Sequence, residues 1–375
     1  MRVTCLAKRW KHHTSSGGYD RLATEVGAKV VSRQKIDGIV SQVGQKLWRD
    51  RTGTGAYLFD YQFGDLLAEA NVLARSALNP PDLLHVLYGD EQLDQLLRWR
   101  RLLRCPLVVT FHQPSHRITH RFERFQKGLA TRINAAIVVS SGQIEGFEKW
   151  IGAKKVVYIP HGIDTNRFSP GGTIADRKRV MILIVGEHLR DWELIHKVID
   201  SSNNQGLPID FHVITKKELA PYFTGCSNIS FHFQIPESEL IALYRSADAL
   251  FVPVIDATAN NAVLESLACG TPVISTAIGG MFDYVNENCG WLLPKSDVTG
   301  VMDLLRRITI DREVAASFRD AARTQAVRFD WKTVTAQVRN LYSAVIEGRA
   351  PSEERESVAE LKRHAQSSPN VRGIR

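Results

Sequence analysis

Apolar runs of strand length alternate with amphipathic helical patterns along almost the whole chain. The first half contains "RVTCLA", "AKVVS", "LLHVLY", "LVVTFH", "AAIVVS" and "VVYIP". The second half contains "VMILIVG", "DFHVIT", "NISFHF", "ALFVPV" and "PVISTA", with helical stretches such as "ESELIALYRSA" and "EVAASFRDAARTQA" between them. Continuous Val, Ile and Leu strands separated by helices indicate parallel sheets that are covered on both faces. The sequence therefore predicts an α/β protein.

A chain of 375 residues is too long for one ordinary core, so we expect two domains. The alternation pauses at residues 165–179, which are rich in Gly and charged residues, and then restarts. We predict an amino-terminal Rossmann-like domain over 1–164, a linker over 165–179 and a second Rossmann-like domain over 180–330. A helix over 331–348 follows and crosses back toward the first domain, and 349–375 form a polar, flexible tail. The apolar face of that helix comprises Val334, Val338, Leu341, Tyr342 and Val345.

Composition narrows the class of protein. Hydrophobic residues make up 44% of the chain and charged residues 23%, which is typical of a folded globular protein. The five cysteines are scattered without a CxxC pair, which argues against a zinc site and a disulfide scaffold. The amino-terminal apolar run is too short for a signal peptide, and no apolar segment of membrane-spanning length follows. We expect a soluble cytoplasmic protein.

The positive charge is concentrated in the first half. Residues 1–170 hold 25 Lys and Arg against 15 Asp and Glu, a net charge of +10, whereas 171–375 hold 23 against 25. Two clusters contribute, at 98–104 and at 116–132; in the second, basic and apolar residues interleave as in a basic amphipathic helix. A phospholipid surface, a phosphorylated acceptor or nucleic acid could be the anionic partner of this half. A basic surface that is merely solvated is the alternative.

Ligands of doubly wound sheets bind at the carboxyl ends of the strands, so the residues there are the candidates for a site. Gly17 and Gly18 follow the first strand and open a helix, where backbone N–H groups can approach a phosphate or a sugar. No GxGxxG fingerprint accompanies them, which disfavours a nicotinamide dehydrogenase. His112 follows "LVVTF", next to a turn, and is either a cleft residue or a histidine bonded within its loop.

Two more candidates follow the first strand of the second half. Gly186 ends that strand, and Arg190 lies near the start of the next helix. There a guanidinium could clamp a diphosphate with two hydrogen bonds. Pairing with Asp191 or Glu193 on the surface is the alternative for Arg190.

The stretch "DATANNAVLESLACGTPVIST" combines three polar candidates with an apolar helix. Asn260 and Asn261 suit a helix start, whose dipole and free N–H groups attract an anion. Glu265 lies one turn further on and could accept hydrogen bonds from the diol of a ribose. Its neighbours Leu264 and Leu267 are apolar, which argues against an ordinary exposed glutamate. We interpret the stretch as a nucleotide-sugar subsite.

These segments resemble the retaining glycosyltransferases of family 4, which have a GT-B fold. "VLESLACGTPVIST" is similar to the family's carboxy-terminal signature, and "VVYIPHGIDTNRFSP" resembles the connector between its domains. "SGGYDRLATEV", "VVTFH", "AAIVVSS", "VGEHLRDW", "NISFHFQIPESELIALYRSADALFVPV" and "FDWKTVTAQVRNLYSAV" occur in a similar order in such enzymes. The resemblance covers residues 1–347.

The resemblance implies two facing Rossmann-like domains with a cleft between them. It implies a nucleotide sugar in the second domain, an acceptor in the first and no metal requirement, and the chain contains no D-x-D triplet. Gln234 joins the donor-binding candidates. Two departures put donor identity and activity in question. The glutamate usual eight residues before Glu265 is Ala257, beside Asp256, and the basic residue usual after "VG" is Glu187.

We therefore expect a retaining glycosyltransferase of polysaccharide or glycolipid biosynthesis that uses a UDP- or GDP-linked sugar and no cofactor. Arg190, the Asn260–Asn261 helix start and the Gly17–Gly18 loop would stabilise the leaving diphosphate, and His112 would contact the sugar. The acceptor is a glycan, a lipid-linked molecule or a small molecule. An anionic membrane, at its inner face, is a candidate partner, and no nucleic acid is expected. The alternatives are a sugar-nucleotide epimerase or phosphorylase on this fold, or a non-catalytic sugar-nucleotide-binding protein.

Overall fold

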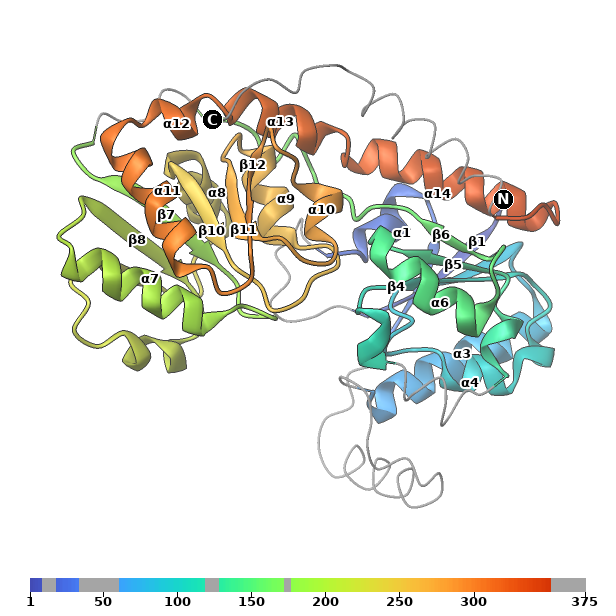
Figure 1. Cartoon of the computed structure of the whole chain (residues 1–375). Coiled ribbons are helices and arrows are strands. Elements are labelled where there is room, and N and C mark those ends of the chain that lie inside the picture. The colour runs from blue at the N-terminus through green and yellow to red at the C-terminus, as the bar shows by residue number, and fades with distance from the viewer. Residues whose placement is uncertain (9–17, 34–60, 119–127, 172–176, 352–375) are drawn as a thin grey trace. The chain divides into compact units, whose positions relative to one another are not determined.

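The computed structural model describes residues 1–8, 18–33, 61–118, 128–171 and 177–351. These residues form two α/β units, each built on a six-stranded parallel sheet (Figure 1). Contacts divide the chain between Ile159 and Pro160, assign the described residues 18–21 to the second unit, and return the chain to the first unit at Thr335. The two parallel sheets predicted from the apolar runs are thereby confirmed.

The first unit has the strand order β2-β1-β3-β4-β5-β6. Its strands are β1 (Val3–Ala7), β2 (Lys29–Ser32), β3 (Leu83–Val86), β4 (Leu107–Phe111), β5 (Ala135–Val138) and β6 (Val156–Tyr158). Its main helices are α1 (Arg21–Glu25), α3 (Phe63–Leu78), α4 (Asp94–Arg98), α6 (Ile144–Ile151) and most of α14 (Trp331–Ile346).

Both faces of the first sheet are covered, and β3 shows why. Leu84 and Val86 belong to the apolar core that includes residues of α3 and α4. His85 points to the opposite face, where its Nδ1 lies 2.6 Å from the hydroxyl of Tyr342 in α14 and its Nε2 lies 2.8 Å from Thr110 Oγ1. Because both ring nitrogens are hydrogen-bonded, this histidine is accommodated in a fully buried strand. Burial lowers its pKa to about 3, so it is neutral.

The second unit has the strand order β12-β11-β10-β7-β8-β9. Its strands are β7 (Val180–Val185), β8 (Ile209–Ile214), β9 (Ile229–His232), β10 (Ala249–Val252), β11 (Val273–Thr276) and β12 (Gly290–Leu293). The sequence did not predict β12, because a four-residue run that begins with glycine carries little strand signal. It pairs with β11 from Val273↔Gly290 to Thr276↔Leu293, and a Cβ at Gly290 would lie only 2.2 Å from the Val273 carbonyl oxygen. Glycine thus lets this strand join the sheet.

Two helical layers cover the second sheet. One apolar core joins the sheet to α7 (Trp192–Asn204) and α11 (Val298–Ile310). The other joins the opposite side to α8 (Glu237–Ser246), α9 (Asn261–Ala268), α10 (Met281–Tyr284) and α13 (Arg319–Val327). The short helix α12 (Glu313–Ala316) precedes α13. Residues that alternate along a strand thus pack on different layers, which explains the continuous apolar runs.

The two ends of the second unit are fixed by buried contacts. The segment predicted as a linker starts as packed chain, because Phe168 is fully buried and Thr165 Oγ1 donates a hydrogen bond of 2.5 Å to Asp330. In α14 the five residues of the predicted apolar face are all buried, which confirms that helix and its face. Within the described residues no helix combines the length and the apolar character needed to cross a membrane. Residues 352–375 of the predicted tail lie outside the described part.

Candidate active site

Helix α9 starts where the two asparagines predicted a helix start. Asn260 is the N-cap, and its side-chain oxygen accepts a hydrogen bond of 3.1 Å from the backbone N–H of Ala262. The N–H groups of Asn261 and Val263 make no hydrogen bond within the described part of the chain. Two free donors at the positive end of the helix dipole are the kind of groups to which anions bind in proteins.

Glu265 lies in the same helix, one turn after Asn261. Its side chain is 7% exposed, so it is not an ordinary surface glutamate. The buried Tyr244 of α8 donates a hydrogen bond of 2.9 Å from its hydroxyl to Glu265 Oε2. Among the described residues Oε1 has no hydrogen-bond partner, and it remains available to accept one. Burial raises the pKa of Glu265 to about 7, so the carboxyl changes charge near neutral pH.

Arg190 connects the loop after β7 with the start of α9. Its Nε and Nη2 donate to the carbonyl oxygen of Val185 at 3.0 and 2.6 Å, and its Nη1 donates to that of His188 at 3.2 Å. Nη2 also lies 3.4 Å from the side-chain oxygen of Asn260. Burial lowers the pKa of Arg190 to about 10, so the guanidinium still carries its charge at neutral pH. The alternative considered for Arg190, a surface pairing with Asp191 or Glu193, is absent from the described interactions.

Gly186 allows this loop to turn. Its φ of 86° lies in the left-handed region, which side chains rarely adopt. A Cβ at Gly186 would also lie 3.0 Å from Arg190 Nη2. The glycine therefore serves the backbone turn that brings the buried guanidinium next to Asn260.

A cation that the sequence reading missed lies beside Glu187. Lys216 follows β8, and its ammonium pairs with the carboxylate of Glu187. Both side chains project from the carboxyl ends of neighbouring strands, β7 and β8. The pair raises the pKa of Lys216. The residue that the resemblance implied to be basic is therefore the acidic Glu187, and the ammonium of Lys216, after the neighbouring strand, pairs with it.

A second glycine pair holds the loop before α9. The loop after β11 contains Gly279 and Gly280, and the N–H of Gly280 donates 2.8 Å to the carbonyl oxygen of Ala257. A Cβ at Gly279 would lie 2.4 Å from that same oxygen, and one at Gly280 would lie 2.3 Å from the oxygen of Thr258. Only glycine permits this approach of two backbones. Residue 257 thus lies in tightly packed chain.

Two further candidates lie in distinct places. Gln234 follows β9 with an exposed side chain and a φ of 52°, a left-handed backbone that is uncommon for a residue with a side chain. Gly18 has a φ of 106°. The ring of the next residue, Tyr19, packs in the second unit against His161 and Trp331, at 5.3 and 5.8 Å between centroids. Gly17 lies outside the described residues.

His112 stands at the carboxyl end of the first unit's sheet, as the sequence predicted. Its Nε2 lies 2.9 Å from the carbonyl oxygen of Leu87, so Nε2 carries the hydrogen. The buried carboxylate of Asp90 accepts the backbone N–H groups of His112 and Gln113 at 2.6 and 3.1 Å. The turn after β4 is therefore held by a residue of the neighbouring strand's loop, which the sequence reading did not single out.

Within the described residues no group of three or more His, Cys, Asp or Glu side chains is arranged to hold a metal ion. The candidates that the structure brings together are Gly186, Arg190, Asn260, Asn261 and Glu265, all at the carboxyl end of the second sheet. The sequence alone did not identify three further features of these loops: Asp90, Lys216 and the Gly279–Gly280 pair. The rule that singled out His112 would have found Lys216, because "TKKE" directly follows a strand.

Solved structures with the same architecture define the fold class as GT-B. A crystal structure of HepE from Anabaena, in complex with UDP and glucose, matches 92% of this chain and 100% of its own with a TM-score of 0.66 and 16% identity. Sucrose-phosphate synthase from Thermosynechococcus elongatus matches 93% of this chain and 100% of its own with a TM-score of 0.68 and 18% identity. The predicted fold class is therefore confirmed.

The sequence narrows that class to a family. Residues 35–167 match the model "Glycosyltransferase Family 4", and residues 215–325 match "Glycosyl transferases group 1". With the GT-B fold, these two matches place the chain among the family 4 and group 1 glycosyltransferases.

Curated relatives carry different names within this family. The sulfoquinovosyl transferase SQD2 of Arabidopsis thaliana is 32% identical over 308 residues, which are 75% of this chain and 60% of that protein. The D-inositol 3-phosphate glycosyltransferase of Geodermatophilus obscurus is 26% identical over 251 residues, which are 59% of this chain and 54% of that protein. The chain thus spans 60% or less of the length of these two relatives.

Proposed function

We propose that this protein transfers a sugar from a nucleotide-sugar donor to an acceptor hydroxyl, with retention of the anomeric configuration. The observation that carries the proposal is the start of α9. Two free N–H groups lie there beside the charged Arg190, and the Glu265 carboxylate follows one helical turn, about 5 Å, further on. An anion site next to a hydroxyl acceptor suits the diphosphate and the ribose of a nucleotide.

In the proposed reaction the bond between the sugar's anomeric carbon and the diphosphate oxygen breaks, and a bond from that carbon to the acceptor oxygen forms. The proton of the acceptor hydroxyl passes to the departing diphosphate. Negative charge develops on the diphosphate as its bond to the anomeric carbon breaks. Hydrogen-bond donors that are already fixed in place stabilise this charge without rearranging. The N–H groups of Asn261 and Val263 are such donors, and Arg190 supplies positive charge beside Asn260. Lys216, which pairs with Glu187 at the carboxyl end of β8, is the second cation of the proposal.

Glu265 is the proposed acceptor of the ribose hydroxyls. Its Oε2 is oriented by Tyr244, and its Oε1 is available. The HepE crystal structures hold UDP and UDP-glucose, which favours a uridine-linked donor as the first to test. A guanosine-linked donor is the second choice.

We assign acceptor recognition to the first unit and contact with the transferred sugar to His112. The hydrogen bond to Leu87 fixes the tautomer of the imidazole, and Asp90 fixes its backbone. The curated relatives differ by name in sugar and acceptor, so we keep the acceptor class at a glycan, a lipid-linked molecule or a small molecule. None of these relatives is an epimerase or a phosphorylase by name.

The first test incubates the purified protein with UDP- and GDP-linked sugars and measures nucleotide release and the unfolding temperature. We expect one donor to release nucleotide slowly by hydrolysis and to raise the unfolding temperature by mass action. Stabilisation without any nucleotide release, with or without acceptors, would favour the non-catalytic alternative. Neither stabilisation nor release with any donor would contradict the proposal.

Metal independence is the second expectation. Charge on the diphosphate is offset by Arg190, Lys216 and the start of α9 in this proposal, and no D-x-D triplet is present in the sequence. Donor turnover should therefore persist in excess chelator. Loss of turnover with chelator and its recovery with magnesium or manganese would contradict this mechanism.

A further inference from the structure

Among the described residues of the first unit, a cluster of basic side chains lies at the end of the sheet opposite to His112. The strands β4, β5 and β6 are neighbours, so their amino ends lie side by side. The segments that precede them are 98–106, 131–134 and 152–155, and they contain no Asp or Glu. Five of their Lys and Arg side chains are exposed: Arg98, Arg101, Arg104, Arg132 and Lys154. We call this surface the basic face.

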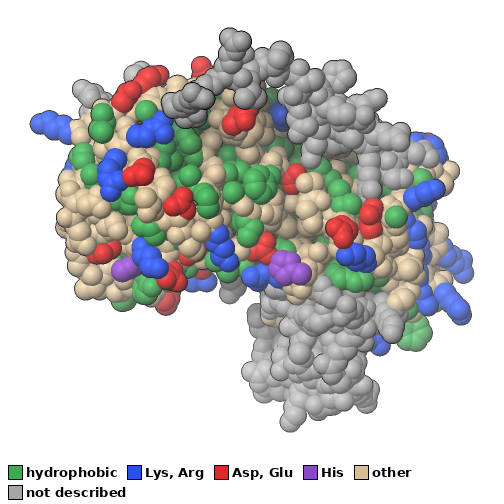
Figure 2. Space-filling view, viewed as in Figure 1, with side chains coloured by type: hydrophobic (Ala, Val, Ile, Leu, Met, Phe, Trp, Pro, Cys, Tyr) green, Lys and Arg blue, Asp and Glu red, His purple; other side chains and the backbone are tan. Residues whose placement is uncertain are grey.

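Figure 2 shows the same feature in space-filling form. Lys and Arg side chains gather along the right-hand edge of the first unit, where the amino ends of its strands lie in Figure 1. The five-residue strand β4 separates the basic face from His112 by about 16 Å. The charge therefore lies away from the carboxyl ends of the strands, where a substrate of this unit is expected.

Four of the five exposed cations are not used by the fold. Arg98, Arg101, Arg104 and Lys154 make no side-chain hydrogen bond or ion pair within the described residues. The neighbouring Arg100 behaves differently. Its guanidinium donates to Leu103 O, Cys105 O and Asn134 Oδ1 at 2.7, 3.0 and 2.9 Å. Arg132 also serves the fold, because its Nη1 donates to the carbonyl oxygen of Leu97 at 3.0 Å. The other four exposed cations stay free to meet an anionic partner.

Two large apolar side chains project from the centre of the basic face. Trp99 is 58% exposed and Leu102 is 46% exposed, and both lie between Arg98 and Arg104. Their position at the end of α4 and in the following 3₁₀ turn is held by Arg100. An exposed tryptophan and leucine among arginines match the interface of a bilayer, where an indole ring sits at the level of the headgroups.

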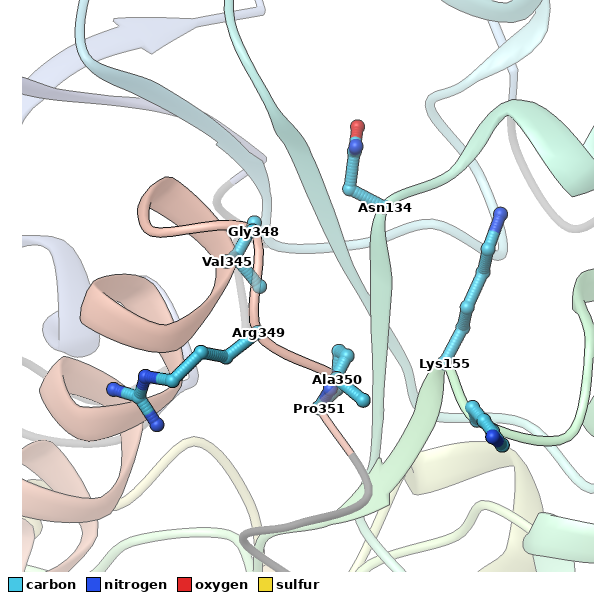
Figure 3. A pocket seen from close by; sticks show the side chains of 8 residues that line it. Asn134, Lys155, Val345, Gly348, Arg349, Ala350 and Pro351 are labelled. Carbon is cyan, nitrogen blue, oxygen red and sulfur yellow. The ribbon is translucent and has the colours of Figure 1, made fainter.

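An open pocket of about 270 Å³ adjoins this surface. Figure 3 shows Asn134 and Lys155 on one side of it and, on the other, Val345 of α14 with Gly348 to Pro351, which follow that helix. Lys155 Nζ donates to the carbonyl oxygens of Thr131 and Ile133 at 2.7 and 3.1 Å, which holds its charge in place. A hollow with a fixed ammonium beside the exposed Lys154 has room for a phosphorylated headgroup.

We propose that the basic face docks on the surface of an anionic phospholipid bilayer, with Trp99 and Leu102 inserted between headgroups. Charge complementarity and the two apolar side chains both point to this partner. A nucleic acid would use the arginines and could stack on the indole, but it offers no apolar place for Leu102. An acidic protein could pair with the four unpaired cations, which come from two of the three segments, but it would leave the exposed Trp99 and Leu102 without an apolar partner. The protein would thus be held at a membrane by the end of the first unit that is remote from His112.

The experiment is sedimentation of the full chain with phosphatidylcholine vesicles of increasing phosphatidylglycerol content, at low and at high salt. Neither donor nor acceptor is present, so the result does not depend on whether the protein transfers a sugar. We expect binding that rises with phosphatidylglycerol and disappears at high salt. Absence of binding at low salt on the most anionic vesicles would overturn the proposal.

Variants locate the contact. Each arginine at an anionic surface contributes about a fivefold gain in binding, so Arg98→Gln, Arg101→Gln and Arg104→Gln together should weaken it about a hundredfold. The matched control removes three exposed, unpaired cations of the second unit, and its binding should stay within a few-fold of the native value: Lys178→Gln, Arg307→Gln and Lys332→Gln. Equal losses of vesicle binding in the two triple variants would mean that the overall charge of the protein, and not the basic face, attaches it to the membrane.

The fluorescence of Trp99 provides a measurement that does not depend on the overall charge of the protein. Brominated lipid should quench part of the tryptophan fluorescence, and Trp99→Phe should abolish that part while the protein still sediments with vesicles. Unchanged quenching in Trp99→Phe would overturn the insertion of this residue. Binding of a labelled oligonucleotide by the native chain, lost in the arginine triple variant and accompanied by no vesicle binding, would assign the basic face to nucleic acid instead.

Discussion

Glu265 is a carboxyl whose burial makes its charge depend on pH near neutrality. Its pKa of about 7 lies above the ordinary value of 4.5, so the folded state holds the proton more tightly than the unfolded state does. The stability from this group is therefore complete below about pH 4.5 and is lost as the pH rises through about 7, with a total change of about 3 kcal/mol. Glu265→Gln, which is neutral throughout, should remove this part of the pH dependence. Urea unfolding from pH 5 to 8 measures the free energy of unfolding of both proteins. Parallel plots of this free energy against pH would contradict the prediction.

Donor binding should show the opposite pH dependence. A ribose diol donates its hydrogen bonds to the ionised carboxylate, so affinity for UDP should rise as the pH passes through about 7. Glu265→Ala removes one charge-assisted contact and should weaken UDP binding about ten- to a hundredfold at pH 8. Tyr244→Phe is the control, because it loses the hydroxyl that orients Glu265 but keeps the carboxylate. Calorimetric titration measures UDP affinity. Equal affinities of the native and Glu265→Ala proteins would show that Glu265 does not bind the ribose.

Arg190 and Lys216 are the two cations that could serve the diphosphate, and their contacts predict different outcomes. Arg190 donates to two backbone carbonyls, so Arg190→Ala should lower both the unfolding temperature and turnover. Lys216 is exposed and pairs only with Glu187 among the described interactions, so Lys216→Ala should lower donor affinity and leave the unfolding temperature within a degree or two. Melting curves and donor kinetics on both variants separate the roles. Normal turnover in both variants would exclude the two cations from charge stabilisation.

At the scale of elements, the start of α9 combines a structural and a binding function that substitutions can separate. Asn260→Ala removes the N-cap and should cost about 1 kcal/mol of stability. Asn260→Asp keeps the cap and the contact with Arg190 but places a negative charge where the diphosphate is proposed to bind. We therefore expect Asn260→Asp to match the native protein in denaturant unfolding and to bind UDP about tenfold more weakly. Native-like UDP affinity in Asn260→Asp would move the diphosphate away from α9.

The strands were predictable because each one, being buried on both faces, is an apolar run bounded by turn residues. Val180–Val185 and Leu107–Phe111 show this in its simplest form. The strand β12 was not predictable in this way. It joins the sheet through the close approach of Gly290 to Val273, a contact between residues 17 positions apart in the chain. Local patterning records burial but not such contacts.

The same limit applies to the candidate site. Asn260 capped α9 as its residue type predicted, because capping is a local property. The orientation of Arg190 was not predictable, since its partners are backbone carbonyls that only the folded loop presents. Lys216 comes next to Glu187 through the pairing of β7 with β8. The pKa of Glu265 likewise depends on burial by α8 and its Tyr244.

At the scale of the whole molecule, each unit has its own sheet and core, and the nucleotide candidates all belong to the second unit. UDP should therefore protect backbone amides in the loops at the carboxyl end of the second sheet, because bound N–H groups and a fixed loop exchange slowly with solvent. The segments concerned are 186–191, 215–217 and 257–265. The loops of the basic face, 131–134 and 152–155, should exchange at the same rate with and without UDP.

Hydrogen exchange with peptide resolution tests this distribution, and the Asn260→Asp variant sharpens it. If the start of α9 holds the diphosphate, protection of 257–265 by UDP should fall in Asn260→Asp at a fixed UDP concentration, and protection of 215–217 should fall with it, because both report one bound ligand. If Lys216 alone holds the diphosphate, the variant should leave both unchanged. Protection confined to the first unit would place the nucleotide on the wrong sheet for the mechanism proposed, since neither Glu265 nor Arg190 could then contact it.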